Sequence, residues 1–221
     1  MTNKNNILII KHGAFGDIIE SEGIMRAIKN YHLESKITYL TSSRYKSLID
    51  CFHYIDDVII DNRNPIWNLS KNLLLLKKIK NYKFDVIYDL QNSQRTSIYK
   101  KFFLVESKWV TTNRKSHPIS GLEGLIEMLV DHGIQDKNSY IPDISWMARD
   151  VSNLLKENNI KSKFILLIPG SSANHKDKRW PYFPDLSKEL IKRGFDVVNI
   201  LGPDETSIES KLNGKNLKNL S

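Results

Sequence analysis

Short apolar runs alternate along the first part of the chain with longer segments in which apolar residues recur every three or four positions. The short runs predict strands, at residues 7–10, 36–41, 57–61, 84–89 and 108–112. The longer segments predict helices, at residues 18–31, 64–80 and 120–133. Strands that are apolar throughout belong to a parallel sheet with helices on both faces, so the expected fold class is α/β.

A second segment of the same kind begins near residue 146. Its pattern predicts a linker helix, a strand, a helix and a further strand, at residues 146–158, 164–168, 182–193 and 195–201. Two parallel strands cannot bury their own faces, so we expect this second domain to be incomplete in the chain. The expected boundaries are 1–145 for the first domain, 146–162 for the linker and 163–221 for the start of the second domain.

Charge is distributed unevenly over the 221 residues, whose formal net charge is +8. Residues 63–115 contain twelve lysines and arginines but three acids, so this stretch alone carries more net positive charge than the whole chain. One explanation is an anionic partner, such as nucleic acid, an acidic membrane surface or a phosphorylated substrate. The other is a surface that merely keeps the protein in solution. The charge pattern leaves both open.

Residue usage disfavours several other classes. The single cysteine, Cys51, allows no internal disulfide and fits a reducing cytoplasm; a small buried apolar side chain explains it better than a nucleophile. The six histidines do not have the spacing of a metal site. No apolar run reaches the length of a membrane span, and the polar start of the chain does not resemble a signal peptide.

The most informative segment runs from Lys11 to Asp17, between a predicted strand and a predicted helix. Gly13 and Gly16 allow a tight turn and a close approach of the backbone to a ligand, and the helix N-terminus offers unpaired N–H groups. Asp17 does not suit a phosphate cradle, because a carboxylate repels phosphate. Two roles stay open for Asp17: a helix cap that favours the helix dipole, and a base that accepts a proton.

Several motifs follow one another in a recognisable order. They are Lys11-x-Gly-x-x-Gly-Asp17, Tyr88-Asp-Leu-Gln91, Pro169-Gly170, Lys178-Arg-Trp-Pro181 and Leu201-Gly-Pro-Asp-Glu205. From residue 7 to about residue 205, the chain resembles glycosyltransferase family 9, the lipopolysaccharide heptosyltransferases. The resemblance implies the GT-B fold: two facing Rossmann-like parallel-sheet domains with the active site between them. It also implies that the N-terminal domain binds the acceptor and the C-terminal domain binds the nucleotide-sugar.

The function implied by this resemblance is inverting glycosyl transfer. A heptose or related sugar moves from a nucleotide-sugar, typically ADP-heptose, to a phosphorylated lipopolysaccharide core acceptor at the inner face of the cytoplasmic membrane. The expected location is the cytoplasm, with peripheral attachment to the inner membrane left open. No cofactor, metal or nucleic acid is implied, and the oligomeric state is left open. The alternative is a catalytically inactive binding module or fragment whose basic surface binds anionic ligands.

By resemblance, Asp17 is the catalytic base and Lys178 binds the donor diphosphate. An inverting transfer needs a base for the acceptor hydroxyl and positive charge for the departing diphosphate. Ser171 and Ser172 lie in a turn before a predicted helix, so we expect them to donate to diphosphate oxygens. A solvated loop is the favoured explanation for three basic neighbours, His175, Lys176 and Arg179.

The acceptor-side residues implied by the resemblance are Gly13, Gly16, Gln91 and Arg95. Gln91 and Arg95 follow the end of a predicted strand, where open α/β sheets bind ligands. Arg95 suits a bidentate contact with an acceptor phosphate; an exposed arginine at a helix start is the equally weighted alternative. His117 precedes the helix predicted from residue 120 and is assigned a structural or acceptor-side role.

Two features depart from the family pattern. Gly23 stands where many relatives carry proline, so acceptor contacts are expected to differ. The family's Asn/Ser-Asp-Ser/Thr-Gly-Pro-x-His turn, which grips the nucleotide, is absent; we expect an incomplete donor site and activity in the parent protein rather than in this chain alone. A nicotinamide-dependent dehydrogenase is disfavoured, because Gly13-x-x-Gly16 is not Gly-x-Gly-x-x-Gly and no ribose-binding acid follows the second strand.

Overall fold

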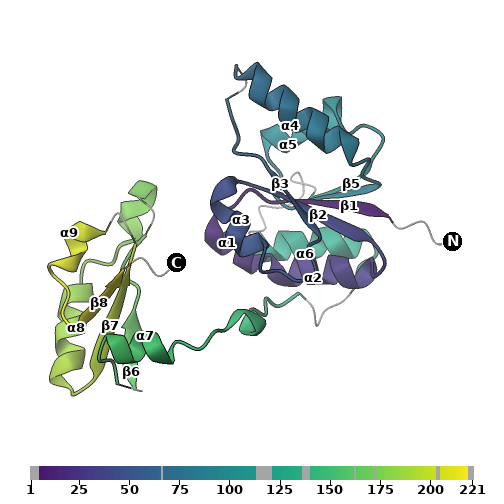
Figure 1. The fold of residues 1–221 in the computed structure, drawn as a ribbon. Coiled ribbons are helices and arrows are strands. Elements are labelled where there is room, and N and C mark those ends of the chain that lie inside the picture. The colour runs from purple at the N-terminus through teal and green to yellow at the C-terminus, as the bar shows by residue number, and fades with distance from the viewer. Residues whose placement is uncertain are drawn as a thin grey trace. The chain divides into compact units, whose positions relative to one another are not determined.

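The structure is a computed structural model that describes residues 5–65, 67–112, 121–135, 140–161, 163–171, 173–202 and 205–218. The chain divides into two compact units, Met1–Ala148 and Arg149–Ser221. Each unit is a parallel sheet with helices packed on it (Figure 1).

The first unit is built on a five-stranded parallel sheet in the order β3-β2-β1-β4-β5. Its strands are β1 (Asn6–Ile10), β2 (Lys36–Thr41), β3 (Asp57–Ile60), β4 (Val86–Asp89) and β5 (Lys108–Thr111). Ile9 lies opposite both Tyr39 of β2 and Tyr88 of β4. The order of strands reverses between β1 and β4, so the carboxyl ends of these two strands form the topological switch point of the sheet.

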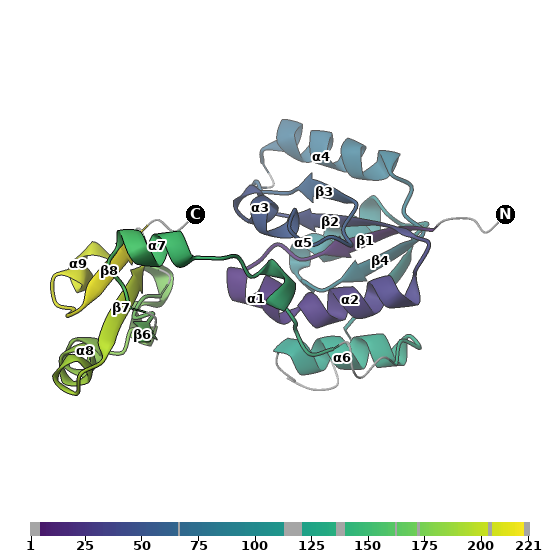
Figure 2. The same ribbon diagram turned by 60° about the horizontal axis from the view of Figure 1, so that its bottom comes forward.

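Helices cover both faces of this sheet. They are α1 (Phe15–Glu20), α2 (Glu22–Tyr31), α3 (Lys46–Ile49), α4 (Leu69–Asn81), α5 (Gln94–Phe102) and α6 (Gly121–Asp131). Figures 1 and 2 show α2 and α6 on one face, with α4 and α5 on the other. Ile7 and Ile9 of β1 pack into the core on the first face, whereas Leu8 and Ile10 pack into the core on the second. The strand is apolar throughout because both of its faces are buried.

The helix predicted over residues 18–31 is two helices, α1 and α2, that meet at Ser21. The Ser21 hydroxyl donates to the backbone carbonyl of Ile18 (2.9 Å). A serine that bonds back to the preceding turn competes with the backbone ladder of a helix. This local contact explains why the apolar periodicity continues where the helix does not.

The helix predicted from residue 64 begins five residues later, at Leu69 of α4. Asn68 is its N-cap, and the Asn68 side chain accepts a hydrogen bond from within the first turn. The carbonyl of Asn64 instead accepts from the Arg95 guanidinium (2.8 Å). A long-range contact therefore holds Asn64 outside the helix that the sequence predicts there.

The second unit is a three-stranded parallel sheet in the order β6-β7-β8. Its strands and helices are α7 (Ser152–Glu157), β6 (Phe164–Leu167), α8 (Phe183–Lys192), β7 (Asp196–Leu201), α9 (Thr206–Glu209) and β8 (Lys215–Lys218). The expectation of about two strands is wrong, because β8 pairs with β7 although Leu217 is its one apolar residue. No helix within the described ranges has the length and apolarity needed to cross a membrane.

The linker helix predicted over residues 146–158 is wrong in extent. A 3₁₀ turn covers Ser145–Met147, and α7 is a separate helix that begins after it. The Trp146 ring packs edge-to-face on Phe52 of the first unit, with 5.4 Å between ring centroids. Leu155 packs instead against the core of the second unit. The apolar residues that suggested one helix therefore belong to two units.

Candidate functional site

Two loops of the first unit meet at the switch point, one after β1 and the other after β4. The Lys11 ammonium donates to the Leu90 carbonyl (3.2 Å), and the backbone amide of His12 donates to Oε1 of Gln91 (2.9 Å). Both contacts join the carboxyl ends of adjacent strands, where open α/β sheets bind ligands. This edge of the sheet is the candidate site.

The two glycines of the loop after β1 have different reasons to be there. Gly13 has a φ of +125°, and a Cβ at this position would lie 2.3 Å from Cε2 of Tyr45. A side chain at Gly13 is therefore excluded by conformation and by space. Gly16 meets nothing within 4 Å of its Cβ position, so the fold does not require glycine there. Its expected contact with the acceptor stays a prediction.

Asp17 is exposed in the first turn of α1. Its Oδ2 accepts a hydrogen bond from the Ala14 amide (2.7 Å), whereas Oδ1 accepts none from the described residues. The cap and the base, which the sequence left as alternatives, are therefore compatible, because only one oxygen of this exposed carboxylate holds the turn. The catalytic role of Asp17 itself stays a prediction.

Lys11 places a positive charge beside Asp17. Burial lowers the pKa of the Lys11 ammonium, and the carboxylates of Asp17, Glu20 and Asp89 oppose that shift only in part. Sequence reasoning gave Lys11 no role of its own. Its position directly after a fully apolar strand was the signal available, because that position puts a side chain at the edge of the sheet.

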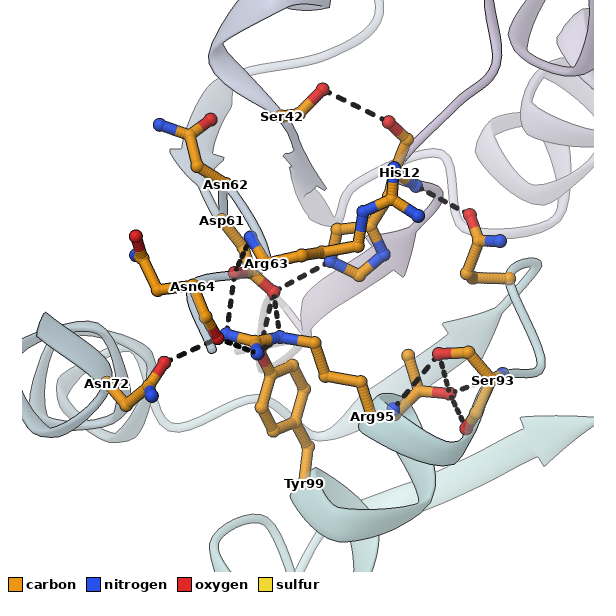
Figure 3. A network of polar contacts seen from close by, with 12 residues as sticks. His12, Ser42, Asp61, Asn62, Arg63, Asn64, Asn72, Ser93, Arg95 and Tyr99 are labelled. Carbon is orange, nitrogen blue, oxygen red and sulfur yellow. Dashed lines mark hydrogen bonds and ion pairs between the residues drawn. The ribbon is translucent and has the colours of Figure 1, made fainter. Parts of the chain in front are cut away.

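Asp61, which follows β3, is the buried centre of a polar network behind this edge (Figure 3). Its Oδ2 lies 2.7 Å from Nε2 of His12 and accepts from the Tyr99 hydroxyl (2.5 Å). Nε and Nη2 of Arg95 donate to the two carboxylate oxygens, each at 2.9 Å. The network therefore ties the loop after β1 to β3 and to α5.

These hydrogen bonds control the ionisation of Asp61. Burial by itself raises the pKa of the Asp61 carboxyl, but hydrogen bonds from His12, Arg95 and Tyr99 outweigh burial and hold the pKa below its usual range. A buried carboxylate with this set of donors is a satisfied ion rather than a strained one. It suits a structural anchor better than a proton carrier.

Arg95 is not the exposed helix-start arginine considered from the sequence. Its side chain is 18% exposed, and it donates to Asn64 and Asn72 as well as to Asp61. The Asp61 carboxylate occupies the planar edge that a bidentate phosphate contact would use. A direct role in acceptor binding stays a prediction for Arg95, but its visible role is to hold this network together. The sequence offered no signal for the pairing with Asp61.

Gln91 and Asp89 shape the loop after β4. The Asp89 carboxylate accepts from the backbone amides of Gln91 (3.0 Å) and Asn92 (2.9 Å). Burial raises the pKa of Asp89, and these amides together with Thr96 counter the shift only in part. Because the Gln91 side chain holds the amide of His12, it positions the loop that leads to Asp17.

In the second unit, a buried carboxylate again lies behind the loops that end two strands. A Cβ on Gly170 would lie 1.7 Å from Oε1 of Glu205, and Glu205 accepts from the Gly202 amide (2.8 Å). The Arg179 guanidinium lies 4.0 Å from this carboxylate and donates to the Ser171 carbonyl (2.8 Å). With its side chain 12% exposed, Arg179 is not the solvated residue that was expected.

The remaining donor-side residues lie in the turn at Ala173–Lys178 and before it. Lys178 is exposed, as are His175 and Lys176. The Ser171 hydroxyl donates to the carbonyl of His175 (2.7 Å), which closes the turn. Ser172, His117, Pro203 and Asp204 lie outside the described residues.

No group of three histidine, cysteine, aspartate or glutamate side chains suited to a metal ion occurs among the residues that the structure describes.

No protein-family profile matches the sequence, and no curated protein matches it either. Solved structures do match. The glycosyl transferase family 9 protein of Veillonella parvula DSM 2008 superposes with a TM-score of 0.74 at 19% identity, over 99% of this chain and 70% of that one. The fold is that of the GT-B glycosyltransferases.

Two Escherichia coli proteins give the same result. The ADP-heptose LPS heptosyltransferase II has a TM-score of 0.67 at 17% identity, over 96% of this chain and 72% of that one. Heptosyltransferase WaaC with ADP-2-deoxy-2-fluoro heptose has a TM-score of 0.64 at 14% identity, over 98% and 77%. The predicted fold class is thus confirmed, whereas identities this low leave the activity to be argued from the site.

Proposed function

We propose that the protein is an inverting glycosyltransferase that moves a heptose or related sugar from a nucleotide-sugar, ADP-heptose above all, to a phosphorylated lipopolysaccharide core acceptor. The observation that carries the proposal is the position of Asp17. It stands exposed at the switch point of a parallel sheet, with one carboxylate oxygen bonded to the Ala14 amide and the Lys11 ammonium in electrostatic contact. The GT-B fold and the glycosyltransferases that share it support it.

The proposed chemistry is a single displacement. Asp17 accepts the proton of an acceptor hydroxyl while that oxygen forms a bond to the anomeric carbon of the sugar. The bond from this carbon to the diphosphate oxygen breaks, and the nucleoside diphosphate leaves with the electron pair. Attack from the side opposite the leaving group inverts the anomeric configuration.

Two lysines, one from each unit, are assigned to two different anionic groups in this reaction. Lys178 is an exposed cation in the turn that follows β6, and we assign it to the negative charge that develops on the departing diphosphate. Lys11 is a partly buried cation beside the base, and we assign it to an anionic group of the acceptor. Ser171 and Gln91 hold the two loops in place through the contacts described above.

The decisive experiment is sugar transfer by the intact protein and its Asp17→Asn variant. Asparagine keeps the shape and the capping oxygen but cannot take the proton, so turnover should fall by roughly 10²–10⁴-fold. Asp185→Asn is the matched control, because Asp185 lies in the first turn of α8 as Asp17 does in α1. It should leave turnover unchanged.

The stereochemistry of the product and two contrary outcomes also test the proposal. The anomeric configuration, read by NMR, should be inverted relative to the donor. Unchanged turnover of Asp17→Asn at saturating donor and acceptor would remove Asp17 from the mechanism. Binding of ADP-heptose with no transfer to any lipopolysaccharide core acceptor would instead support the catalytically inactive binding module.

A further inference from the structure

An apolar groove with a basic surround lies between α4 and α5, on the side of the sheet that both helices cover. The groove measures about 190 Å³ and is lined mainly by apolar side chains, among them Leu69, Leu73, Leu76, Ile98 and Phe103. Figure 1 shows the two helices side by side on this face. We call the exposed apolar residues of this region the α4–α5 face: Trp67, Leu69, Leu73, Leu74, Ile98, Phe102 and Val105.

The core of the first unit does not account for this exposure. Within the run of four leucines in α4, Leu75 and Leu76 pack against the core on this side of the sheet. Leu73 and Leu74 point elsewhere and are 61% and 69% exposed, and Trp67 just before the helix is 84% exposed. Single exposed leucines are ordinary, but Leu69, Leu73 and Ile98 line one groove together, and an exposed apolar cluster marks an interaction surface.

Basic side chains predominate around the face, although Glu106, next to Val105, is exposed there as well. Residues 62–84 contain no acidic side chain but hold six basic ones, Arg63, Lys71, Lys77, Lys78, Lys80 and Lys83. All six are exposed, as are Lys100 and Lys101 of α5, a helix that also lacks acids. Lysines that alternate with leucine and tryptophan on one surface are typical of helices that lie in the headgroup region of an anionic bilayer.

We propose that the α4–α5 face binds the surface of an anionic phospholipid bilayer. The lysines contact headgroup phosphates, while Trp67, Leu73 and Leu74 enter the boundary between headgroups and acyl chains. Nucleic acid would leave these apolar side chains in water, and an acidic protein would not need so many of them. None of these side chains is a group assigned to glycosyl transfer, so vesicle binding can fail without affecting the proposed function.

The Asp61 side chain connects the groove to the candidate site. Arg95 and Tyr99 line the inner wall of the groove, and both donate to Asp61. Asp61 in turn contacts His12 in the loop before Asp17. Binding at the α4–α5 face would therefore hold the base of the first unit close to a bilayer in which a lipid-linked acceptor is anchored.

The test is sedimentation of the protein with vesicles of phosphatidylcholine, with and without phosphatidylglycerol. Wild type should pellet with the anionic vesicles only, and added salt should release it. Leu73→Ser with Leu74→Ser should weaken binding about tenfold or more, because the apolar anchors are lost. Lys77→Gln with Lys78→Gln should also weaken it about tenfold or more.

Two matched variants control for surface change as such. Leu33→Ser replaces a leucine that is 68% exposed elsewhere in the first unit, and Lys188→Gln with Lys192→Gln replaces two exposed lysines of α8. Both should bind vesicles as wild type does, and circular dichroism should show every variant folded. Equal pelleting with neutral and anionic vesicles, or no loss in the α4 variants, would overturn the proposal. So would a dimer in sedimentation equilibrium that Leu73→Ser dissociates, since a second copy would then cover the face.

Discussion

The two units bury very different numbers of apolar side chains. Among the described residues, twenty buried apolar side chains pack on one face of the first sheet and nine on the other. The described part of the second unit has seven buried apolar side chains, of which three form its core cluster. In the second unit Leu166 of β6 and the adjacent Ile168 stay 46% and 63% exposed. Because burial of apolar surface is the main stabilising contribution, the first unit is expected to hold its loops more rigidly.

The comparison extends to the polar groups behind the loops. Each unit has a buried carboxylate at the carboxyl end of its sheet, Asp61 or Glu205, with an arginine beside it. In the first unit Arg95 meets both carboxylate oxygens at 2.9 Å, but in the second Arg179 stays 4.0 Å away. The arginine–carboxylate pair is thus close and bidentate in the first unit and more widely spaced in the second.

The largest difference between the units is expected when each buried carboxylate is removed and the free energy of unfolding is measured. Asp61→Ala leaves Arg95 largely buried without its counter-ion and should lower the free energy of unfolding of the first unit by about 3–5 kcal/mol. Glu205→Ala should lower that of the second unit by about 1–3 kcal/mol, because Arg179 keeps its bond to Ser171. Urea unfolding followed by tryptophan fluorescence and circular dichroism measures both. An Asp61→Ala effect no larger than that of Glu205→Ala would break the comparison.

Acid should act on the first unit through Asp61. Its folded-state pKa is lowered, so between that pKa and the unfolded value of about 3.9 the unfolded chain binds more protons than the folded one. The free energy of unfolding therefore rises with pH in this window and falls on acidification. Asp61→Asn should flatten this dependence below about pH 4. An equally steep acid loss in Asp61→Asn would assign it to other carboxylates.

Proteolysis should expose the difference in core size. Limited digestion of the whole chain, read by mass spectrometry, should cut within 149–221 at least about ten times faster than within the strands of the first unit, because a smaller core opens at a lower free-energy cost. Cleavage inside β1 or β4 at a comparable rate would show that core size does not govern stability here.

The smallest effect on stability is expected at an exposed residue of the donor side. Lys178 is exposed, so Lys178→Ala should leave the free energy of unfolding unchanged and weaken ADP binding to the intact protein about tenfold, by loss of one charge-assisted contact. Isothermal calorimetry measures the affinity, and Lys188→Ala on α8 is the control. Equal ADP affinity in wild type and Lys178→Ala would make Lys178 an ordinary surface lysine.

Local pattern was enough for most of the elements. The strand predicted over residues 36–41 has the same bounds as β2, and the strand predicted over 164–168 is one residue longer than β6. Apolar periodicity works here because a strand between two layers of helices must be apolar at every position. It failed for β8, whose four residues include one apolar side chain and whose pairing depends on β7.

The candidate site likewise combines features set by local sequence with contacts between distant parts of the chain. The positions of the turn at Gly13 and of the Asp17 carboxylate could be predicted from the sequence, since the positive φ of Gly13 and the hydrogen bond from Ala14 to Asp17 are local features. The pairing of Asp61 with Arg95, 34 positions away, depends on the fold, as does the place of Leu73 in a groove beside α5. Contacts of this kind follow from the order of strands in the sheet, which no local pattern of residues records.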